Sequence, residues 1–258
     1  MKKYELLVND TINVEGRTLY RIKALIDFGY VKIGQLGGYI EKEDNLSHEG
    51  NCWVSGNAMV YDNAKVLGNA WVYDNAKVYG NAKVYGNAMV YDNAKVFEDA
   101  QVYGNAQVYG YAQVYGNAWV YDNAQVYRKA KVCGRNARVF ENAQVYGNAW
   151  VYDNAKVYGD SAVFGNAKVY GDATICSNAY ISSNDDYAYI HGFGSENRTT
   201  TFFKTKDNSI EVKCGCFFGT LDEFKSKVKE THKDSGYAKE YLAIVYAIEI
   251  RFKNRKDK

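Results

Sequence analysis

The sequence predicts a mainly β protein built around a parallel β-solenoid. A six-residue unit, clearest as VYGNAK or VYDNAK, recurs 22 times from Val54 to about Ser183. Val or Ile comes first and a small residue fifth, so both side chains lie on one face of an extended segment. The third and fourth places hold Gly, Asp or Asn in most units, and these residues favour tight corners. A short fixed period of this kind indicates a solenoid rather than an ordinary globular domain.

The even length of the unit fixes which side chains point inward. Because six is even, Val and Ala keep the same facing from one unit to the next, and a slip of one residue would turn them outward. The one irregular step runs from Val132 to Val139 and has seven residues. We expect its additional residue in the corner at Gly134 or Arg135, where the facing of the strands is unaffected.

The ends of a solenoid expose open strand edges, so we expect a cap at each end. Residues 1–50 contain the β-rich segments KYELLV, TLYRIKALIDF and GYVKIG, with a turn at Gly37 and Gly38. They predict an amino-terminal β cap. Residues 51–183 form the predicted solenoid.

Residues 184–258 predict a carboxy-terminal α+β domain. Strands are expected near 187–192, 199–204 and 210–214. A helix is expected from Leu221, because Thr220 and Glu223 form a capping box. A second helix is expected from about Tyr237. Its predicted apolar stripe comprises Tyr237, Tyr241, Ile244, Val245, Ile248 and Phe252.

The repeat resembles that of the hexapeptide-repeat left-handed β-helix proteins, in which three units form one triangular coil. The resemblance implies a left-handed helix of about seven triangular coils. The segment IDFGYVKIGQLGGYIEKEDNLSHEGNCWV, residues 26–54, further resembles the bacterial YdcK-like proteins, which carry an acyltransferase label. The segments RTTTFF and CGCFFGTL resemble carboxy-terminal domains of uncharacterised bacterial and phage proteins. This resemblance implies a phage or prophage origin.

Taking every third unit sorts the outward residues into three faces, because residues 18 apart should stack in columns. One face has no charged residue at these places. The other two faces carry the basic residues Lys77, Lys95, Lys131 and Lys168, and Lys65, Lys83, Arg138 and Lys156. Aromatic enrichment with depletion of charge is typical of interface cores. We therefore predict that the uncharged face packs against a second copy of the chain or a cap. The predicted contact residues are Trp53, Trp71, Tyr73, Met89, Tyr91, Tyr109, Tyr127 and Tyr146.

A second interpretation of the same residues needs no partner. Outward tyrosine ladders stabilise neighbouring strands by stacking, and Tyr also occupies the two charged faces. The sequence leaves this alternative open.

The family resemblance implies an alternative function, acyl transfer from acetyl-CoA. The relatives use a histidine as general base. The three histidines of this chain all lie outside the repeats, and only His48 lies beside them. We predict a non-catalytic scaffold and keep the acyltransferase, with His48 as base, as the alternative.

Four residues near the carboxy terminus have the side chains that bind structural zinc: His191, Cys214, Cys216 and His232. One residue separates the two thiols, where two to four are usual. We therefore predict packing residues rather than a metal site, and no cofactor. The five cysteines likewise indicate reduced thiols rather than a disulfide framework.

Charge and hydropathy limit the classes of binding partner. The formal net charge of +2 and the absence of a long basic run argue against nucleic acid and membrane surfaces. No secretory segment or membrane-spanning run is present, so a cytoplasmic location is expected. A homo-oligomer is predicted, and a protein or carbohydrate partner is left open, because Tyr, Asn and Gly are common in binding surfaces.

Overall fold

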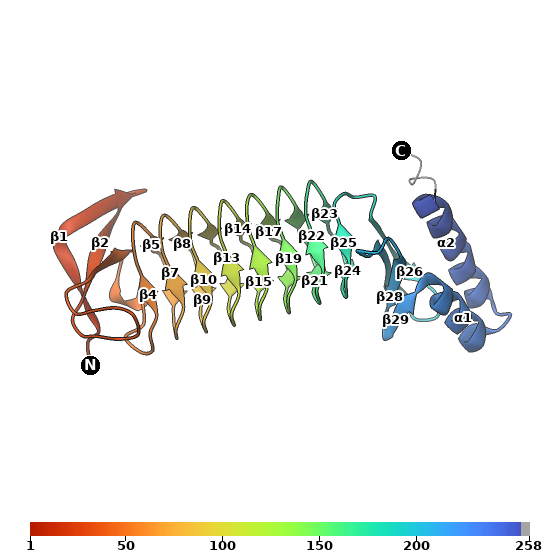
Figure 1. Cartoon of the computed structure of the whole chain (residues 1–258), viewed down its shortest axis with the longest axis horizontal. Helices are drawn as coiled ribbons and strands as arrows, with labels where there is room; N and C mark the ends of the chain where they lie inside the picture. Colours follow the sequence, from red (N-terminus) through yellow and green to blue (C-terminus); the bar gives the residue numbers. More distant parts are fainter. Residues whose placement is uncertain (254–258) are drawn as a thin grey trace.

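The computed structural model describes residues 1–253 as an elongated solenoid with a different structure at each end (Figure 1). The solenoid contains 22 strands of two residues, β4 to β25. Each strand pairs in parallel with the strand three positions along the chain, so the strands form three sheets. The predicted parallel β-solenoid with three strands per coil is confirmed.

Sheet 1 contains the strands whose outward places carry no charge. It consists of β4 (Trp53–Val54), β7 (Trp71–Val72), β10 (Met89–Val90), β13 (Gln107–Val108), β16 (Gln125–Val126), β19 (Gln144–Val145), β22 (Ala162–Val163) and β25 (Tyr180–Ile181).

Sheets 2 and 3 carry the basic columns. The solenoid strands of sheet 2 are β5 (Met59–Val60), β8 (Lys77–Val78), β11 (Lys95–Val96), β14 (Gln113–Val114), β17 (Lys131–Val132), β20 (Trp150–Val151) and β23 (Lys168–Val169). Sheet 3 consists of β6 (Lys65–Val66), β9 (Lys83–Val84), β12 (Gln101–Val102), β15 (Trp119–Val120), β18 (Arg138–Val139), β21 (Lys156–Val157) and β24 (Thr174–Ile175).

The inward rows form one continuous core. The first-place Val and Ile side chains and the fifth-place alanines are fully buried from Val54 to Ile181, and Ser161 takes the alanine place once with 1% exposed. The units account for just over seven coils. Strand β3 (Leu36–Ile40) and a bridge from Leu46 to Val66 begin an additional coil before them.

The irregular step is accommodated in a corner, as expected. The backbone N–H of Asn117 donates to the carbonyl of Gly134, and that of Asn136 donates to Asp153. These bonds continue the pattern of the neighbouring coils, so Arg135 is the additional residue. Trp119 still pairs with Arg138 across the step, and the strands keep their facing.

The amino-terminal cap extends sheet 2. Strands β1 (Tyr4–Val14) and β2 (Arg17–Ala24) form an antiparallel hairpin, β2 pairs antiparallel with β3, and β3 pairs in parallel with β5. A 3₁₀ helix, η1 (Glu43–Asn45), follows β3. The cap thus continues the solenoid's own hydrogen bonding and covers one of its ends.

The carboxy-terminal structure is an antiparallel sheet with two helices. This terminal sheet has the order β26 (Tyr187–Phe193), β27 (Arg198–Lys204), β28 (Ile210–Cys214) and β29 (Phe217–Thr220). Helices α1 (Leu221–His232) and α2 (Gly236–Lys253) follow. The capping box of Thr220 and Glu223 is present. Residues 254–258 of the predicted domain lie outside the described residues.

The predicted stripe of α2 is wrong at its first position. Tyr237 is 50% exposed, and Ala238 is buried in its place, followed by Tyr241, Val245, Ile248 and Phe252. Tyr237 lies in the first turn, and its ring is tilted against that of His232 with centroids 6.1 Å apart. Neither helix, nor any other helix in residues 1–253, is long and apolar enough to cross a membrane.

Candidate interaction surface

The outward side of sheet 1 carries a ladder of stacked aromatic rings. Tyr73, Tyr91, Tyr109 and Tyr127 stack in sequence, with ring centroids 4.8, 4.8 and 4.9 Å apart and planes within 4° of parallel. The ladder continues through Tyr146 to Phe164. It arises because the second-place residue of every third unit stands directly above its counterpart in the next coil.

A second column runs beside this ladder. Trp71, Met89 and Gln107 occupy its first half and pair strand to strand. The phenol of Tyr91 donates a hydrogen bond to Gln107 Oε1 over 3.3 Å, and Tyr127 donates to Gln144 over 3.2 Å. The two columns are therefore joined at several points and present a regular surface.

Burial moves the pKa of the ladder tyrosines further above neutral pH. Partial burial raises the pKa of Tyr91 to about 12, and the neighbouring phenols of Tyr73 and Tyr109 add to this shift. The pKa of Tyr73 and that of Tyr109 are also raised, with burial the largest cause. At neutral pH these side chains are neutral hydrogen-bonding groups on an apolar surface.

The tryptophans distinguish sheet 1 from the other two sheets. On sheet 3, Arg138 lies 5.0 Å from the ring centroid of Trp119. On sheet 2, Lys131 lies 4.6 Å and Lys168 5.6 Å from that of Trp150. Within residues 1–253, Trp71 has no cation over its ring. Cations thus lie over the half-buried tryptophans of the charged sheets, Trp119 and Trp150, and leave Trp71 uncovered.

The uncharged region has a limit at its carboxy-terminal end. Arg128, a corner residue, places its guanidinium 5.8 Å from the ring centroid of Tyr146. The part of sheet 1 without a cation over it therefore extends from Trp71 to Tyr127. We call this region the sheet 1 surface, and its outward residues are Trp71, Tyr73, Met89, Tyr91, Gln107, Tyr109, Gln125 and Tyr127.

The sheet 1 surface is hollowed next to the amino-terminal cap. A cavity of about 590 Å³ is lined by Gly29, Tyr30, Asn51, Ser55, Asn69, Trp71, Tyr73, Asn87 and Met89. Tyr30 is 90% exposed and comes from the cap. Sequence analysis missed Tyr30, because it lies in an aperiodic loop and no repeat position indicates where it faces.

Trp53, one of the residues predicted to contact a second copy or a cap, is fully buried. Tyr4 and Phe28 pack edge-on against it, with ring centroids 6.3 and 5.4 Å away. The amino-terminal cap thus covers the first rung of sheet 1, so Trp53 is not available for another chain.

His48 lies in the cap and is held there by its neighbours. Its Nδ1 accepts the backbone N–H of Lys3 over 3.2 Å, and its ring stacks on Tyr4 with centroids 4.4 Å apart. Its Nε2 lies 3.8 Å from a carboxylate oxygen of Glu43. These contacts describe a packed histidine at one end of the molecule.

The four candidate zinc ligands have separate surroundings. His191 Nδ1 lies 2.8 Å from Thr199 Oγ1, and Thr200 Oγ1 donates to Cys214 Sγ over 3.0 Å. Cys216 is exposed, and His232 stacks on Tyr241. Across residues 1–253, the structure places no group of three or more His, Cys, Asp or Glu side chains so that it could hold a metal ion.

Comparison with known families agrees with the repeat geometry. Residues 82–96, 112–128 and 143–159 match the family model described as the YdcK beta solenoid repeat. No curated protein matches the chain. The matched segments lie in the coils between β9 and β21, and in these segments the solenoid is similar to the YdcK beta solenoid repeat.

Proposed function

We propose that this protein is a non-catalytic scaffold that associates with a second copy of itself through the sheet 1 surface. One observation carries the proposal. The outward strand places of sheet 1 hold no charged residue in eight successive strands, whereas sheets 2 and 3 carry Lys or Arg at most of theirs. Charge depletion with aromatic enrichment favours burial against another surface.

The regular spacing favours a second copy as the occupant. The rings of the ladder are 4.8 to 4.9 Å apart. A partner can pack against every rung only if its own surface repeats at the same distance. Another copy of this solenoid has the same spacing between coils and therefore meets this condition. A surface with a different spacing would match only a few of the stacked rings. Trp71 and Met89 line the same cavity as Tyr30 and provide the most apolar part of the contact.

The proposal predicts a mass in solution that is a multiple of 29.1 kDa. We expect Trp71→Lys and Tyr91→Lys to reduce the mass to that of one chain, because each places an ammonium group in the buried contact. Light scattering coupled to size-exclusion chromatography measures this.

The charged sheets offer matched controls. Tyr85 on sheet 3 stacks on Tyr103 and donates to Gln101, as Tyr91 stacks on Tyr109 and donates to Gln107. Trp119 is the outward residue of strand β15 on sheet 3, as Trp71 is the outward residue of strand β7 on sheet 1. Tyr85→Lys and Trp119→Lys should therefore leave the mass unchanged. A wild-type protein that has the mass of one chain at every concentration that stays dissolved would refute self-association.

Calorimetry with acetyl-CoA separates this proposal from the acyltransferase alternative. A scaffold should give no saturable heat, whereas a hexapeptide-repeat acyltransferase should bind the donor. The sequence motifs that the carboxy-terminal domain shares with phage proteins would place such a scaffold among phage or prophage proteins.

A further inference from the structure

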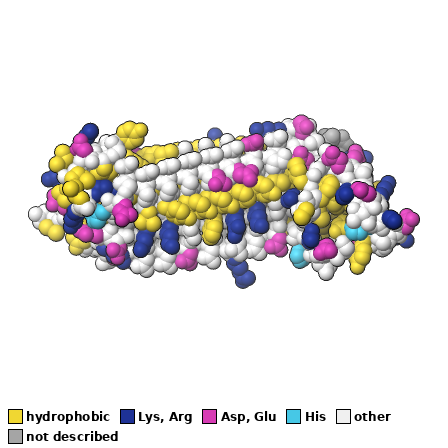
Figure 2. Space-filling model, turned by 90° about the horizontal axis from the view of Figure 1, so that it is seen from below, with side chains coloured by type: hydrophobic (Ala, Val, Ile, Leu, Met, Phe, Trp, Pro, Cys, Tyr) yellow, Lys and Arg dark blue, Asp and Glu magenta, His cyan; other side chains and the backbone are white. Residues whose placement is uncertain are grey.

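A second hollow lies where sheet 3 meets the terminal sheet, well away from the sheet 1 surface. Its volume is about 540 Å³, and it is lined by Phe140, Lys156, Tyr158, Thr174, Arg198, Thr199, Lys213 and Gly215. Figure 2 looks onto this side of the molecule, where a hydrophobic stripe runs along the solenoid with Lys and Arg side chains beside it. The hollow is at the carboxy-terminal end of that stripe.

Three cations from three different strands line the hollow, and no carboxylate does. Lys156 lies in β21, Arg198 in β27 and Lys213 in β28. Arg198 forms an ion pair with Glu196 at 3.4 Å. In residues 1–253, Lys156 and Lys213 form no ion pair. The fold therefore places two lysines that form no ion pair on the lining of one hollow, and opposite charge on a ligand would be attracted to them.

Two carboxylates of the neighbouring corners, Glu141 and Asp172, accept hydrogen bonds within the solenoid. Glu141 accepts the backbone N–H of Gly159 over 2.9 Å, and Asp172 accepts a side-chain N–H of Asn154 over 3.0 Å. Glu211 lies two residues before Lys213, and burial raises the pKa of its carboxyl group despite a hydrogen bond with Ser177. None of these groups lines the hollow or neutralises it directly.

The remaining walls supply hydroxyl groups and an aromatic surface. Thr174 and Thr199 also line the hollow, and Thr199 Oγ1 lies 2.8 Å from His191 Nδ1. Phe140 and Tyr158 stack with ring centroids 4.7 Å apart and form the last full step of the sheet 3 ladder. The cavity therefore combines donors for an anion with a flat apolar wall.

We propose that this hollow binds a phosphate monoester, with the phosphate among the three cations and the organic group against Phe140 and Tyr158. A phosphate monoester is a dianion above pH 6 and presents three strongly accepting oxygens in a tetrahedral arrangement. Such a group accepts from cations on several sides at once, whereas a planar carboxylate is best matched by one guanidinium. This site is independent of self-association, because it lies on a different sheet.

Calorimetric titration with phenyl phosphate at pH 7.5 and low salt tests the proposal. We expect saturable binding that Lys156→Gln and Lys213→Gln each weaken by at least about fivefold, the effect of removing one charge-assisted hydrogen bond. Lys65→Gln is the matched control, because Lys65 occupies the same column of sheet 3 at the far end of the solenoid. It should change affinity by less than about twofold, as a distant screened charge would.

Two related anions test the two parts of the site. Inorganic phosphate should bind more weakly than phenyl phosphate, because it does not contact the aromatic wall. Benzoate should bind most weakly, because it carries one charge and no tetrahedral group. The proposal is overturned if phenyl phosphate gives no saturable heat, if Lys65→Gln weakens binding as much as Lys156→Gln does, or if benzoate binds as tightly as phenyl phosphate. Melting curves of the variants check that each is folded.

Discussion

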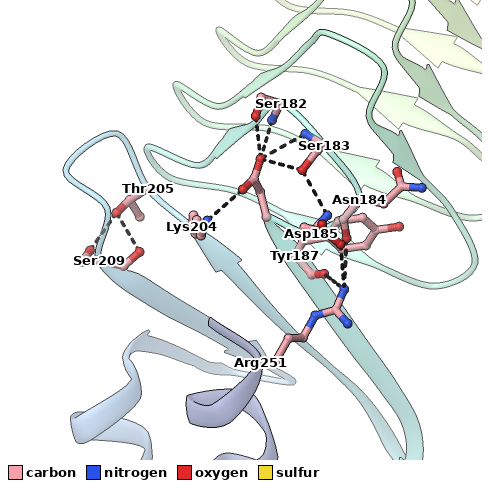
Figure 3. Close-up of polar contacts among 10 residues, drawn as sticks. Ser182, Ser183, Asn184, Asp185, Tyr187, Lys204, Thr205, Ser209 and Arg251 are labelled. Atoms are coloured by element: carbon pink, nitrogen blue, oxygen red, sulfur yellow. Dashed lines mark hydrogen bonds and ion pairs between the residues drawn. The ribbon is translucent and has the colours of Figure 1, made fainter. Parts of the chain in front are cut away.

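Asp186 and Lys204 form an ion pair of 3.0 Å that joins the loop after the last solenoid strand to β27 of the terminal sheet. The other carboxylate oxygen of Asp186 accepts hydrogen bonds from the backbone N–H and the hydroxyl of both Ser182 and Ser183, over 2.7 to 3.3 Å (Figure 3). Asp186 is 8% exposed. This buried carboxylate therefore links the end of the solenoid to the terminal sheet, beside the hydrogen bond from the Thr174 backbone N–H to Thr201 Oγ1.

Asp186→Asn should destabilise the carboxy-terminal domain by about 2 kcal/mol, because buried hydrogen-bond donors and Lys204 lose a charged acceptor. Circular dichroism at 222 nm measures this domain, because helices α1 and α2 are both in it. Tryptophan fluorescence measures the solenoid, which contains all four tryptophans. Asp234→Asn, at an exposed position between the helices, is the control. Equal loss in both signals would contradict the assignment of Asp186 to the junction.

The same carboxylate predicts a dependence on acid. Burial alone would raise the pKa of Asp186, but hydrogen bonds from Ser182 and Lys204 outweigh it and hold the pKa below the usual 3.8. A lowered pKa stabilises the folded state above the ordinary value, and this contribution is lost as the pH falls through the folded-state pKa. The stability difference between wild type and Asp186→Asn should thus be constant near pH 6 and shrink below about pH 4. Denaturation followed at 222 nm between pH 6 and pH 2.5 measures it.

The repeat explains why so much of this fold could be predicted. The same burial requirement applies to 22 first-place Val or Ile residues and to 21 fifth-place Ala or Ser residues, so the facing of residues such as Val108 and Ala106 follows from the period alone. The columns on the three sheets follow as well, because residues 18 apart must stack. The exposure of Trp53 could not be predicted in this way, because it depends on where the aperiodic segment with Tyr4 and Phe28 lies.

The two cavities were beyond sequence reasoning for the same reason. Tyr30 reaches the sheet 1 surface from a loop of the cap, and Lys213 reaches the end of sheet 3 from the terminal sheet. Both approaches depend on how non-repeating segments dock onto the solenoid, and no local pattern encodes this. Strand β29 was missed because Phe217–Thr220 is short and follows CGC without an alternating pattern.

The aromatic ladders predict a loss of stability in alkali. Burial is the largest cause that raises the pKa of Tyr91 to about 12, and the same holds for Tyr103 and Tyr115. A raised tyrosine pKa favours folding below the unfolded-state value near 10, and the contribution is lost as the pH rises through the folded-state value. Tryptophan fluorescence should thus show lower resistance to denaturant at pH 11 than at pH 9.

Absorbance titration of phenolate gives the direct measurement for these tyrosines. Most ladder tyrosines should ionise well above pH 10, so the absorbance should rise later in the folded protein than in denaturant. Tyr85→Phe and Tyr91→Phe should each remove a late-titrating group. A titration centred at 10 in the folded protein would contradict the assigned burial of the rings.

Trp53→Ala should destabilise the amino-terminal end by about 3 to 5 kcal/mol, the usual cost of removing a fully buried tryptophan. The side chain is completely buried and contacts both Tyr4 and Phe28. Loosening the cap would also expose the edge of the first coil, which favours association between strand edges. Trp119→Ala, on a half-buried outward position, should cost about 1 kcal/mol.

Hydrogen exchange and light scattering distinguish these two effects of Trp53→Ala. We expect faster exchange in β1 to β3 and unchanged exchange in β26 to β28, since the terminal sheet lies at the opposite end (Figure 1). Aggregation should increase with protein concentration. Equal acceleration at both ends would show that the cap does not protect the amino-terminal end separately.

Asparagine ladders along the corners give a graded prediction. Asn105 donates to Asn123 Oδ1 over 3.0 Å and accepts from Asn87 over 3.1 Å, whereas the Asn166 side chain, among residues 1–253, accepts one bond, from Asn148 over 3.1 Å. Asn105→Ala removes two of these bonds and Asn166→Ala removes one. At about 0.5 kcal/mol for each exposed bond, the losses should be about 1 and 0.5 kcal/mol in urea unfolding followed by tryptophan fluorescence. Equal losses would contradict a contribution from each side-chain bond, because Asn105 takes part in two of these bonds and Asn166 in one.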